Sequence, residues 1–216
     1  MIEKILSVDF NDKTLIKQAI THPSLKRKGA DYERMEFLGD HVLGLVISEA
    51  LYNKYPDEDE GQLTKRLAGL ICGDTLFEVA KKLELGEYIL MAESEASGGG
   101  RESKANLENA MEAIIGAIYL DQGLETARIF IMHNWEKLID DMLEPPKDAK
   151  SSLQEWAQGR GLPLPEYEVI AQEGPSHAPE FEVQVSVEGK APATGKGSSK
   201  RAAEQEAAGK LLESLG

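Results

Sequence analysis

The sequence predicts a mainly α-helical protein in two parts, an all-helical domain over residues 1–143 and a small α+β domain over 151–216, with a linker at 144–150. Up to residue 143 the apolar residues recur at helical spacing. Two later segments, PEYEVIAQEG and EFEVQVSVEG, alternate polar and apolar residues as half-buried strands do. Between the two patterns, EPPKDAK at 144–150 combines two prolines with mixed charge, which is typical of a linker.

The helices of the first part are predicted from their apolar spacing and from the residues that end them. Residues 31–54 stop before Pro56, and residues 74–85 end at Gly86. SGGG at 97–100 is expected to be a flexible loop and not a phosphate cradle, because no strand precedes it and no GK[ST] follows. The predicted helices are 12–20, 31–54, 60–71, 74–85, 103–121 and 124–143.

The second part is predicted to fold in the order α-β-β-β-α. SSLQEWAQGRG is a short amphipathic helix ended by glycine, and the two alternating segments follow as strands. KAPATGKGSSK is expected to supply a third strand and a turn, and SKRAAEQEAAGKLLESL a helix with alanine on its packing face. This length suffices for one small α+β domain.

Composition restricts the class of protein. With 41% hydrophobic and 29% charged residues, the 216-residue chain is typical of a soluble globular protein. No apolar run is long enough to span a bilayer, and MIEKILSVDF does not have the pattern of a secretory signal. We therefore expect a cytoplasmic protein without a membrane partner. Cys72 is the single cysteine, which excludes an internal disulfide and an all-cysteine zinc site.

The net charge of −14 argues at first against a nucleic-acid partner, since phosphate contacts come from Lys and Arg. The charge is unevenly spread, however, and residues 190–201 hold four basic residues and no acid. Local clustering decides whether a polyanion docks. Alone, this cluster is more typical of a solvated helix cap. Together with the α-β-β-β-α order and GPSH at 174–177, it favours a nucleic-acid surface.

Three carboxylates in ERMEFLGDHVL, residues 33–43, lie unusually close to apolar positions. On an ideal helix Glu33, Glu36 and Asp40 fall within roughly 60° of one another, at the border of the apolar stripe. Like charges at this spacing destabilise a helix, so a cation is expected to offset them.

A fourth acid, Glu112, is the only charged residue of AMEAIIGAIYL at 110–120. Because a helix that is apolar nearly all round is buried, Glu112 must meet a cation, be protonated or line a cleft. Asn109 offers an amide oxygen on the same face. Two interpretations stay open: the acids share a Mg²⁺ site able to activate water, or Glu33 and Glu36 are a solvated face and Glu112 pairs with an Arg.

ERMEFLGDHVL closely resembles the signature of the ribonuclease III family of double-strand-specific endoribonucleases. ITHPS at 20–24, DEGQLTKRLAGLI at 59–71 and ENAMEAIIGAIYLD at 108–121 agree in order and spacing, and the tail is similar to a double-stranded-RNA-binding domain. The resemblance implies a metal-dependent hydrolase that cuts double-stranded RNA to 5′-phosphate products in rRNA and mRNA processing. It implies Mg²⁺ as cofactor, with Mn²⁺ as a substitute.

By position, the resemblance implies that Glu36 and Asp40 are metal ligands and that Glu112 is the third ligand. Asp40 and Glu112 are the implied catalytic residues, and Glu33 and Glu60 match acids that support cleavage or RNA contact.

Asn109 departs from the family, which usually has Asp here. The change removes one charge, so we expect weaker metal binding, and a non-cleaving RNA-binding dimer is the alternative function. Glu108 points about 100° away from Asn109 on an ideal helix and is expected to be a poor substitute.

The resemblance also implies a homodimer, in which Phe37 matches an aromatic residue that inserts into the partner; a core Phe is the alternative. His41, where the family commonly has a small polar residue, is expected to serve packing or surface. Duplex RNA is read through its 2′-hydroxyls and phosphates, and a helix N-terminus attracts phosphate. The expected RNA-binding residues are Gln154, Glu155, His177, Lys196, Lys200 and Arg201.

Overall fold

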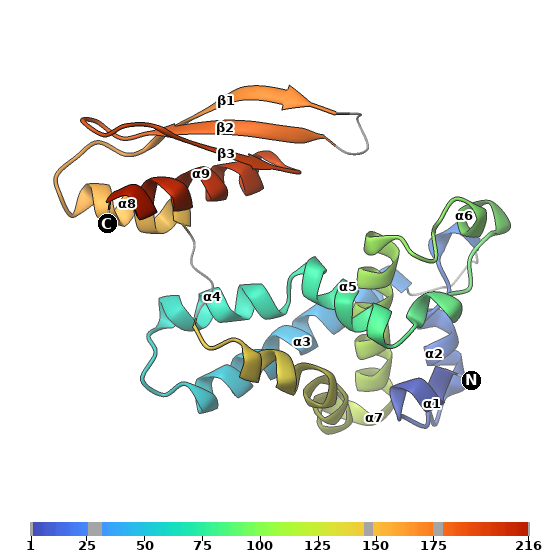
Figure 1. Ribbon diagram of the computed structural model, residues 1–216. Helices are drawn as coiled ribbons and strands as arrows, with labels where there is room; N and C mark the ends of the chain where they lie inside the picture. Colours follow the sequence, from blue (N-terminus) through green and yellow to red (C-terminus); the bar gives the residue numbers. More distant parts are fainter. Residues whose placement is uncertain (1, 26–31, 145–148, 175–178, 216) are drawn as a thin grey trace. The chain divides into compact units, whose positions relative to one another are not determined.

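The protein folds into two compact units, Met1–Pro146 and Lys147–Gly216, each with its own hydrophobic core (Figure 1). The structure is a computed structural model that describes residues 2–25, 32–144, 149–174 and 179–215. Within those ranges the first unit is helical apart from one isolated bridge, Thr21 with Leu90, and the second has the order α-β-β-β-α. The predicted fold class is therefore confirmed. No helix in the described ranges is both long and apolar enough to cross a membrane.

The longer helices of the first unit follow the predicted ones, with one difference at α7. The short elements α1, η1, η2 and α6, of three to five residues each, were not predicted, because they are too short to show a periodic pattern. The predicted helices at 103–121 and 124–143 form one element, α7, bent at Gly123, whose φ of 80° is readily adopted only by glycine. The elements are α1 (Ile2–Leu6), α2 (Lys13–Ala19), η1 (Pro23–Leu25), α3 (Tyr32–Lys54), α4 (Glu60–Leu70), α5 (Gly73–Lys82), η2 (Leu85–Glu87), α6 (Glu93–Ser97) and α7 (Lys104–Asp141).

The expected loop at 97–100 is a hydrogen-bonded turn that follows α6. Gly99 adopts a φ of 85°, and the amide of Gly100 donates to the carbonyl oxygen of Glu95 at 2.9 Å. The three glycines therefore serve a tight turn between α6 and α7.

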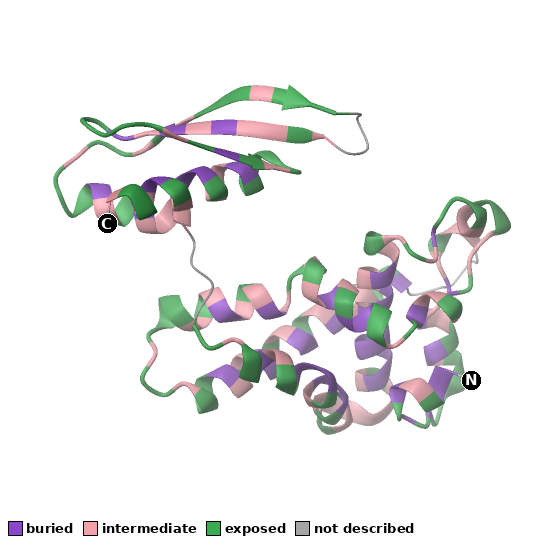
Figure 2. Cartoon of the chain, in the orientation of Figure 1, coloured by how far each residue is buried: buried purple, intermediate pink, exposed green. Residues whose placement is uncertain are grey.

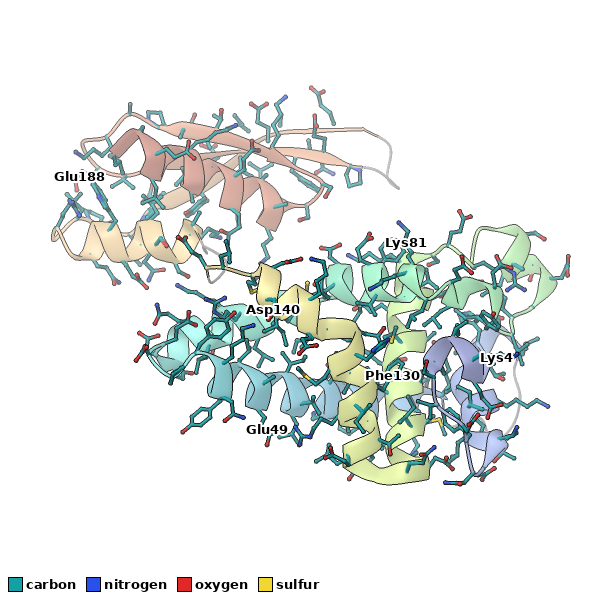
Figure 3. All side chains as sticks on the ribbon, turned by 60° about the horizontal axis from the view of Figure 1, so that its bottom comes forward. Lys4, Glu49, Lys81, Phe130, Asp140 and Glu188 are labelled. Atoms are coloured by element: carbon teal, nitrogen blue, oxygen red, sulfur yellow. The ribbon has the colours of Figure 1, made fainter. Side chains whose placement is uncertain are left out.

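The first half of α7 lies in the core of the first unit, where every residue from 113 to 118 is buried (Figure 2). Its second half packs against α3 and is joined to it by the ion pairs Arg128–Glu49 and Lys54–Asp140. Glu49 and Asp140 are labelled in Figure 3. Burial on both sides of the bend thus fixes α7 against α3.

The last turn of α7 is held by Arg66 of α4, which is only 1% exposed. Its guanidinium makes a two-pronged ion pair with Glu58, at 2.6 and 2.7 Å, and stacks on the ring of Tyr55 at 3.8 Å. The remaining donors reach the carbonyl oxygens of Met142 and Leu143. A helix leaves its last carbonyls without partners, and a buried arginine satisfies two carbonyls just beyond this end.

The second unit packs two helices against one face of a three-stranded antiparallel sheet of order β1-β2-β3 (Figure 1). Gly195 and Gly197 let β3 lie close to α9, since a Cβ at Gly195 would be 2.2 Å from the amide nitrogen of Ala207. The first helix begins at Ala149, two residues before the start expected for this domain. The elements are α8 (Ala149–Gln158), β1 (Glu166–Glu173), β2 (Glu180–Ser186), β3 (Ala193–Gly197) and α9 (Lys200–Leu215).

Candidate active site

Two glycines let α3 and α7 cross with their backbones in contact. A Cβ on Gly39 would lie 1.8 Å from the carbonyl oxygen of Glu112, and one on Gly116 would lie 2.2 Å from that of Met35. Glu36 and Asp40 flank Gly39 along α3, and Glu112 precedes Gly116 by one turn of α7. The crossing therefore places the predicted acids of two helices beside each other.

The electrostatics of Glu112 agree with this placement. Burial, and after it the negative charges of Asp40, Glu36 and Glu108, together raise the pKa of Glu112 to about 8. All the charges that act on it are negative, so an arginine partner for Glu112 finds no support in the described part of the chain. This favours the Mg²⁺ interpretation, because no cation of the described residues is among the charges that act on Glu112.

The pKa of Glu36 is also raised, first by burial and then by Glu33 and Glu108. The predicted residues Glu36, Asp40 and Glu112 thus share one electrostatic environment, with Glu33 at its margin. Burial and the charges of Glu36 and Glu112 likewise raise the pKa of the Tyr32 phenol, which is only 4% exposed.

Asn109 and Glu60, the two other predicted site residues, differ from these acids in their surroundings. Asn109 is partly buried on α7, one turn before Glu112. Glu60 is the first residue of α4 and is not among the charges that act on Glu36 or Glu112. Glu60 instead lines a groove of about 750 Å³ between α3 and α4, together with Leu45, Tyr52 and Leu67.

The outward face of α3 carries a row of exposed apolar side chains. Phe37 is 67% exposed, which contradicts the alternative of a core Phe, and its ring lies 4.5 Å from that of His41. His41 is a surface residue, as expected. Leu45 and Tyr52, which are 56% and 73% exposed, continue the row at helical spacing.

In the second unit the expected basic residues surround the start of α9. Lys200 and Arg201 are exposed in its first turn, where the hydroxyl of Ser199 accepts a hydrogen bond from the amide of Ala202 at 3.2 Å. Lys196, on β3, lies 3.8 Å from the carboxylate of Glu182 on β2. The first turn of α9 therefore presents two cations at the N-terminus of a helix, as a phosphate site would.

The expected residues of α8, Gln154 and Glu155, are exposed. Lys150 ties the start of α8 to the second turn of α9, through an ion pair with Glu204 at 2.5 Å and an amide hydrogen bond to Gln205 at 3.3 Å. His177 lies outside the described residues.

Comparison with known families accounts for both units. The family profile described as Ribonuclease-III-like matches residues 12–138, and that described as Double-stranded RNA binding motif matches residues 149–215. The first match spans more than half of the chain and contains all the expected acids on α3, α4 and α7. The chain belongs to the ribonuclease III family. It is an endoribonuclease of this family with a double-stranded-RNA-binding domain.

Ribonuclease III relatives match along nearly the whole chain. Ribonuclease 3 of Wolbachia sp. subsp. Drosophila simulans (strain wRi) is 48% identical over 220 residues, which cover 100% of this chain and 95% of the relative. Ribonuclease 3 of Ehrlichia ruminantium (strain Welgevonden) is 46% identical over 217 residues, 99% of this chain and 96% of the relative.

Solved structures support the same assignment. The crystal structure of the nuclease domain of ribonuclease III from Campylobacter jejuni is 40% identical, has a TM-score of 0.59 and covers 68% of this chain and 96% of that chain. Dicer from Pichia stipitis is 25% identical, with a TM-score of 0.50 and 94% of each chain covered.

Ribonuclease III enzymes depend on a metal, and the donors at the crossing fit one by their chemistry. Carboxylate and amide oxygens are the ligands of hard divalent cations. Among the residues with described positions, no three His, Cys, Asp or Glu side chains are drawn together tightly enough to hold an ion.

Sequence reasoning missed two residues of this ribonuclease III site. Tyr32 precedes Glu36 by one turn of α3, and Glu108 precedes Glu112 by one turn of α7. The i, i+4 spacing was the available signal. The rotation of about 100° between Glu108 and Asn109 made Glu108 a poor substitute for Asp at position 109, but Glu108 lies on the same face of α7 as Glu112.

Proposed function

We propose that the chain is a Mg²⁺-dependent endoribonuclease that hydrolyses phosphodiester bonds in double-stranded RNA, with Mn²⁺ as a substitute metal. The observation that carries the proposal is the convergence of Glu36, Asp40 and Glu112 where α3 and α7 cross, with an unbalanced negative charge. Family membership supports the reaction class, and the acid cluster supports the divalent cation.

In this proposal Glu36, Asp40 and Glu112 hold the cation, and Asn109 adds a neutral oxygen. When bound, the cation stabilises the charge that develops on the phosphoryl oxygens. Water adds to the phosphorus, the bond to the 3′ oxygen breaks, and that oxygen leaves as a hydroxyl, so the phosphate stays on the 5′ end. Asp40 and Glu112 act as the catalytic carboxylates, and Glu33 and Glu60 support RNA contact.

We further propose a homodimer formed through the outward face of α3. Phe37, Leu45 and Tyr52 expose apolar surface there, and the apolar groove between α3 and α4 adjoins it. Such a row on a single helix is typical of a buried interface. A dimer would give each duplex two acid clusters, one for each strand.

The second unit is proposed to grip the duplex through Gln154, Glu155 and His177 at 2′-hydroxyls, and through Lys196, Lys200 and Arg201 at phosphates. Its exposed cations at the start of α9 support this role. The proposed substrates are rRNA and mRNA precursors in the cytoplasm, as expected of a ribonuclease III.

The alternative is a non-cleaving, dimeric double-stranded-RNA-binding protein. One observation favours it, namely that Asn109 removes a carboxylate from the acid cluster.

Cleavage of a long perfect RNA duplex, with and without Mg²⁺ or Mn²⁺, tests the nuclease proposal. We expect metal-dependent shortening by the wild type. Glu112→Gln should abolish cutting and leave duplex binding intact, because it keeps the side chain's size and removes its charge. Glu78→Gln, which removes one charge from the exposed side of α5, is the matched control and should cut normally. Duplex binding without cleavage at any metal concentration would favour the alternative.

A further inference from the structure

Glu108 lies on the same stripe of α7 as Glu112, one helical turn earlier. Residues four apart lie about 40° apart around a helix, so the two side chains project from one face. Glu108 contributes to the raised pKa of both Glu36 and Glu112, and these two acids belong to different helices. Its charge is therefore close enough to act on the acids of both helices, although the neighbouring Asn109 occupies the position that the family fills with Asp.

The Glu108 carboxylate lies directly against Gly73, the first residue of α5. A Cβ on Gly73 would lie 2.4 Å from Oε2, 2.6 Å from Oε1 and 2.6 Å from Cδ of Glu108. All three contacts are closer than nonbonded atoms allow, so any side chain at position 73 would displace the carboxylate. Gly73 thus forms a space that the Glu108 carboxylate fills.

Two features favour a negative charge at this position. The N-terminal end of a helix carries partial positive charge, and Gly73 begins α5. Lys104, which makes an ion pair with Asp74 at 2.6 Å, is close enough for the charge of Glu108 to raise its pKa. Glu108 therefore lies beside the start of α5, and its charge also acts on the acid cluster.

We propose that Glu108 is an additional carboxylate of the metal site, which supplies the negative charge that Asn109 does not, and that Gly73 keeps it in position. The inference rests on the proposed function and deepens it. Mg²⁺ usually keeps several of its waters, and outer carboxylates that accept hydrogen bonds from such waters strengthen binding. Glu108 is a positioning residue in this sense, since it acts on the cation through those waters and through Glu112.

Calorimetric titration of the full chain with Mn²⁺, without RNA, tests the role directly. Loss of an outer partner typically weakens metal affinity about 10-fold or more, and we expect Glu108→Gln to raise the Kd by that factor. Gly73→Ala should have a similar effect with every charge retained, because its methyl group occupies the place of the carboxylate. Glu78→Gln and Gly209→Ala are the matched controls: the first removes an exposed charge of α5, and the second adds a methyl group to α9 with no contact nearer than 3.8 Å.

A second substitution separates lost charge from lost structure. If Glu108 supplies the missing charge, Asn109→Asp in the Glu108→Gln background should restore affinity to within a few-fold of the wild type. A Kd unchanged by Glu108→Gln, or no recovery with Asn109→Asp, would overturn the inference. If Gly73→Ala does not fold, Glu108→Gln and its combination with Asn109→Asp are sufficient to test the inference.

The same titration keeps this inference apart from the proposed function. A wild type that binds Mn²⁺ and cuts duplex RNA, with Glu108→Gln equal to it, refutes the role of Glu108 and leaves the nuclease intact. A wild type that binds no divalent cation refutes the metal site as a whole.

Discussion

At the scale of single residues, the acid cluster stores an unfavourable charge interaction that a proton or a cation relieves. Glu112 could be predicted from the sequence, because a lone carboxylate in an apolar helix must have a partner or a cleft. Glu108 could not, because its importance depends on the space at Gly73, which is 35 residues earlier and belongs to another helix. Exposure of Phe37 agrees with the expectation from the family resemblance, whereas its apolar character alone fits a core or an interface.

The raised pKa of Glu112 predicts how stability depends on pH without metal. Between the ordinary value of 4.5 and about 8, the folded protein holds a proton on Glu112 that the unfolded chain releases. The stabilisation from this proton is complete below pH 4.5 and is lost as the pH rises through about 8. Glu36, whose pKa is also raised, acts in the same direction, and Asp40 and Glu108 are the other acids that face Glu112.

Urea unfolding in EDTA, from about pH 5 to about pH 9, measures this effect. The free energy of unfolding of the wild type should fall relative to that of Glu112→Gln as the pH rises. Mg²⁺ should reverse the fall, because a cation replaces the proton. Parallel curves for the two proteins would contradict the shifted pKa.

At the scale of elements, the crossing of α3 and α7 determines where the site forms. Periodicity predicted both helices, since each buries a long apolar face. Periodicity could not predict that they touch at Gly39 and Gly116, because a glycine within a helix gives no sign of what approaches it. The bend at Gly123 was read as an end between two helices for the same reason, and tertiary packing joins them.

Gly39→Ala tests the crossing. The added methyl group would lie 1.8 Å from the carbonyl oxygen of Glu112, so the helices must separate. Overpacking of this kind typically costs about 1–3 kcal/mol, and a loss of at least that size in the free energy of unfolding is expected, with weaker Mn²⁺ binding.

Gly61→Ala in the first turn of α4 is the control for this change. A Cβ there would have an ordinary contact, 3.4 Å from the carboxylate of Asp59. Helix propensity favours Ala over Gly by about 1 kcal/mol, so this variant should be no less stable than the wild type. Equal stability of Gly39→Ala and the wild type would show that the helices do not approach as closely as described.

At the scale of the whole molecule, an acidic chain binds a polyanion by dividing the work between two units. The net charge of −14 repels RNA, and the exposed cations at the start of α9 provide a local exception. The sequence pattern predicted this division, because polar and apolar residues alternate with period two in the strands of the second unit and recur at helical spacing in the first. The cations could be located along the chain, but their grouping at the N-terminus of a helix depends on where α9 begins.

Replacing Lys200 and Arg201 together by Ala should weaken duplex binding evenly across RNA sequences. Each lost phosphate contact reduces the slope of log affinity against log salt by about 1, so the double variant should lose about 2. Filter binding at several salt concentrations measures the slope. Lys210→Ala, on the same helix but paired with Glu206, should leave it unchanged.

Arg66, which binds carbonyl oxygens just beyond the end of α7, affects where the catalytic unit can be truncated. The family match ends at residue 138, yet Arg66 directs its buried donors to the carbonyl oxygens of residues 142 and 143. A chain shortened to the family boundary would lose both of these acceptors, and hydrogen bonds to a charged group contribute to stability. We therefore expect a catalytic unit that ends after Leu143 to be more stable than one that ends at residue 138.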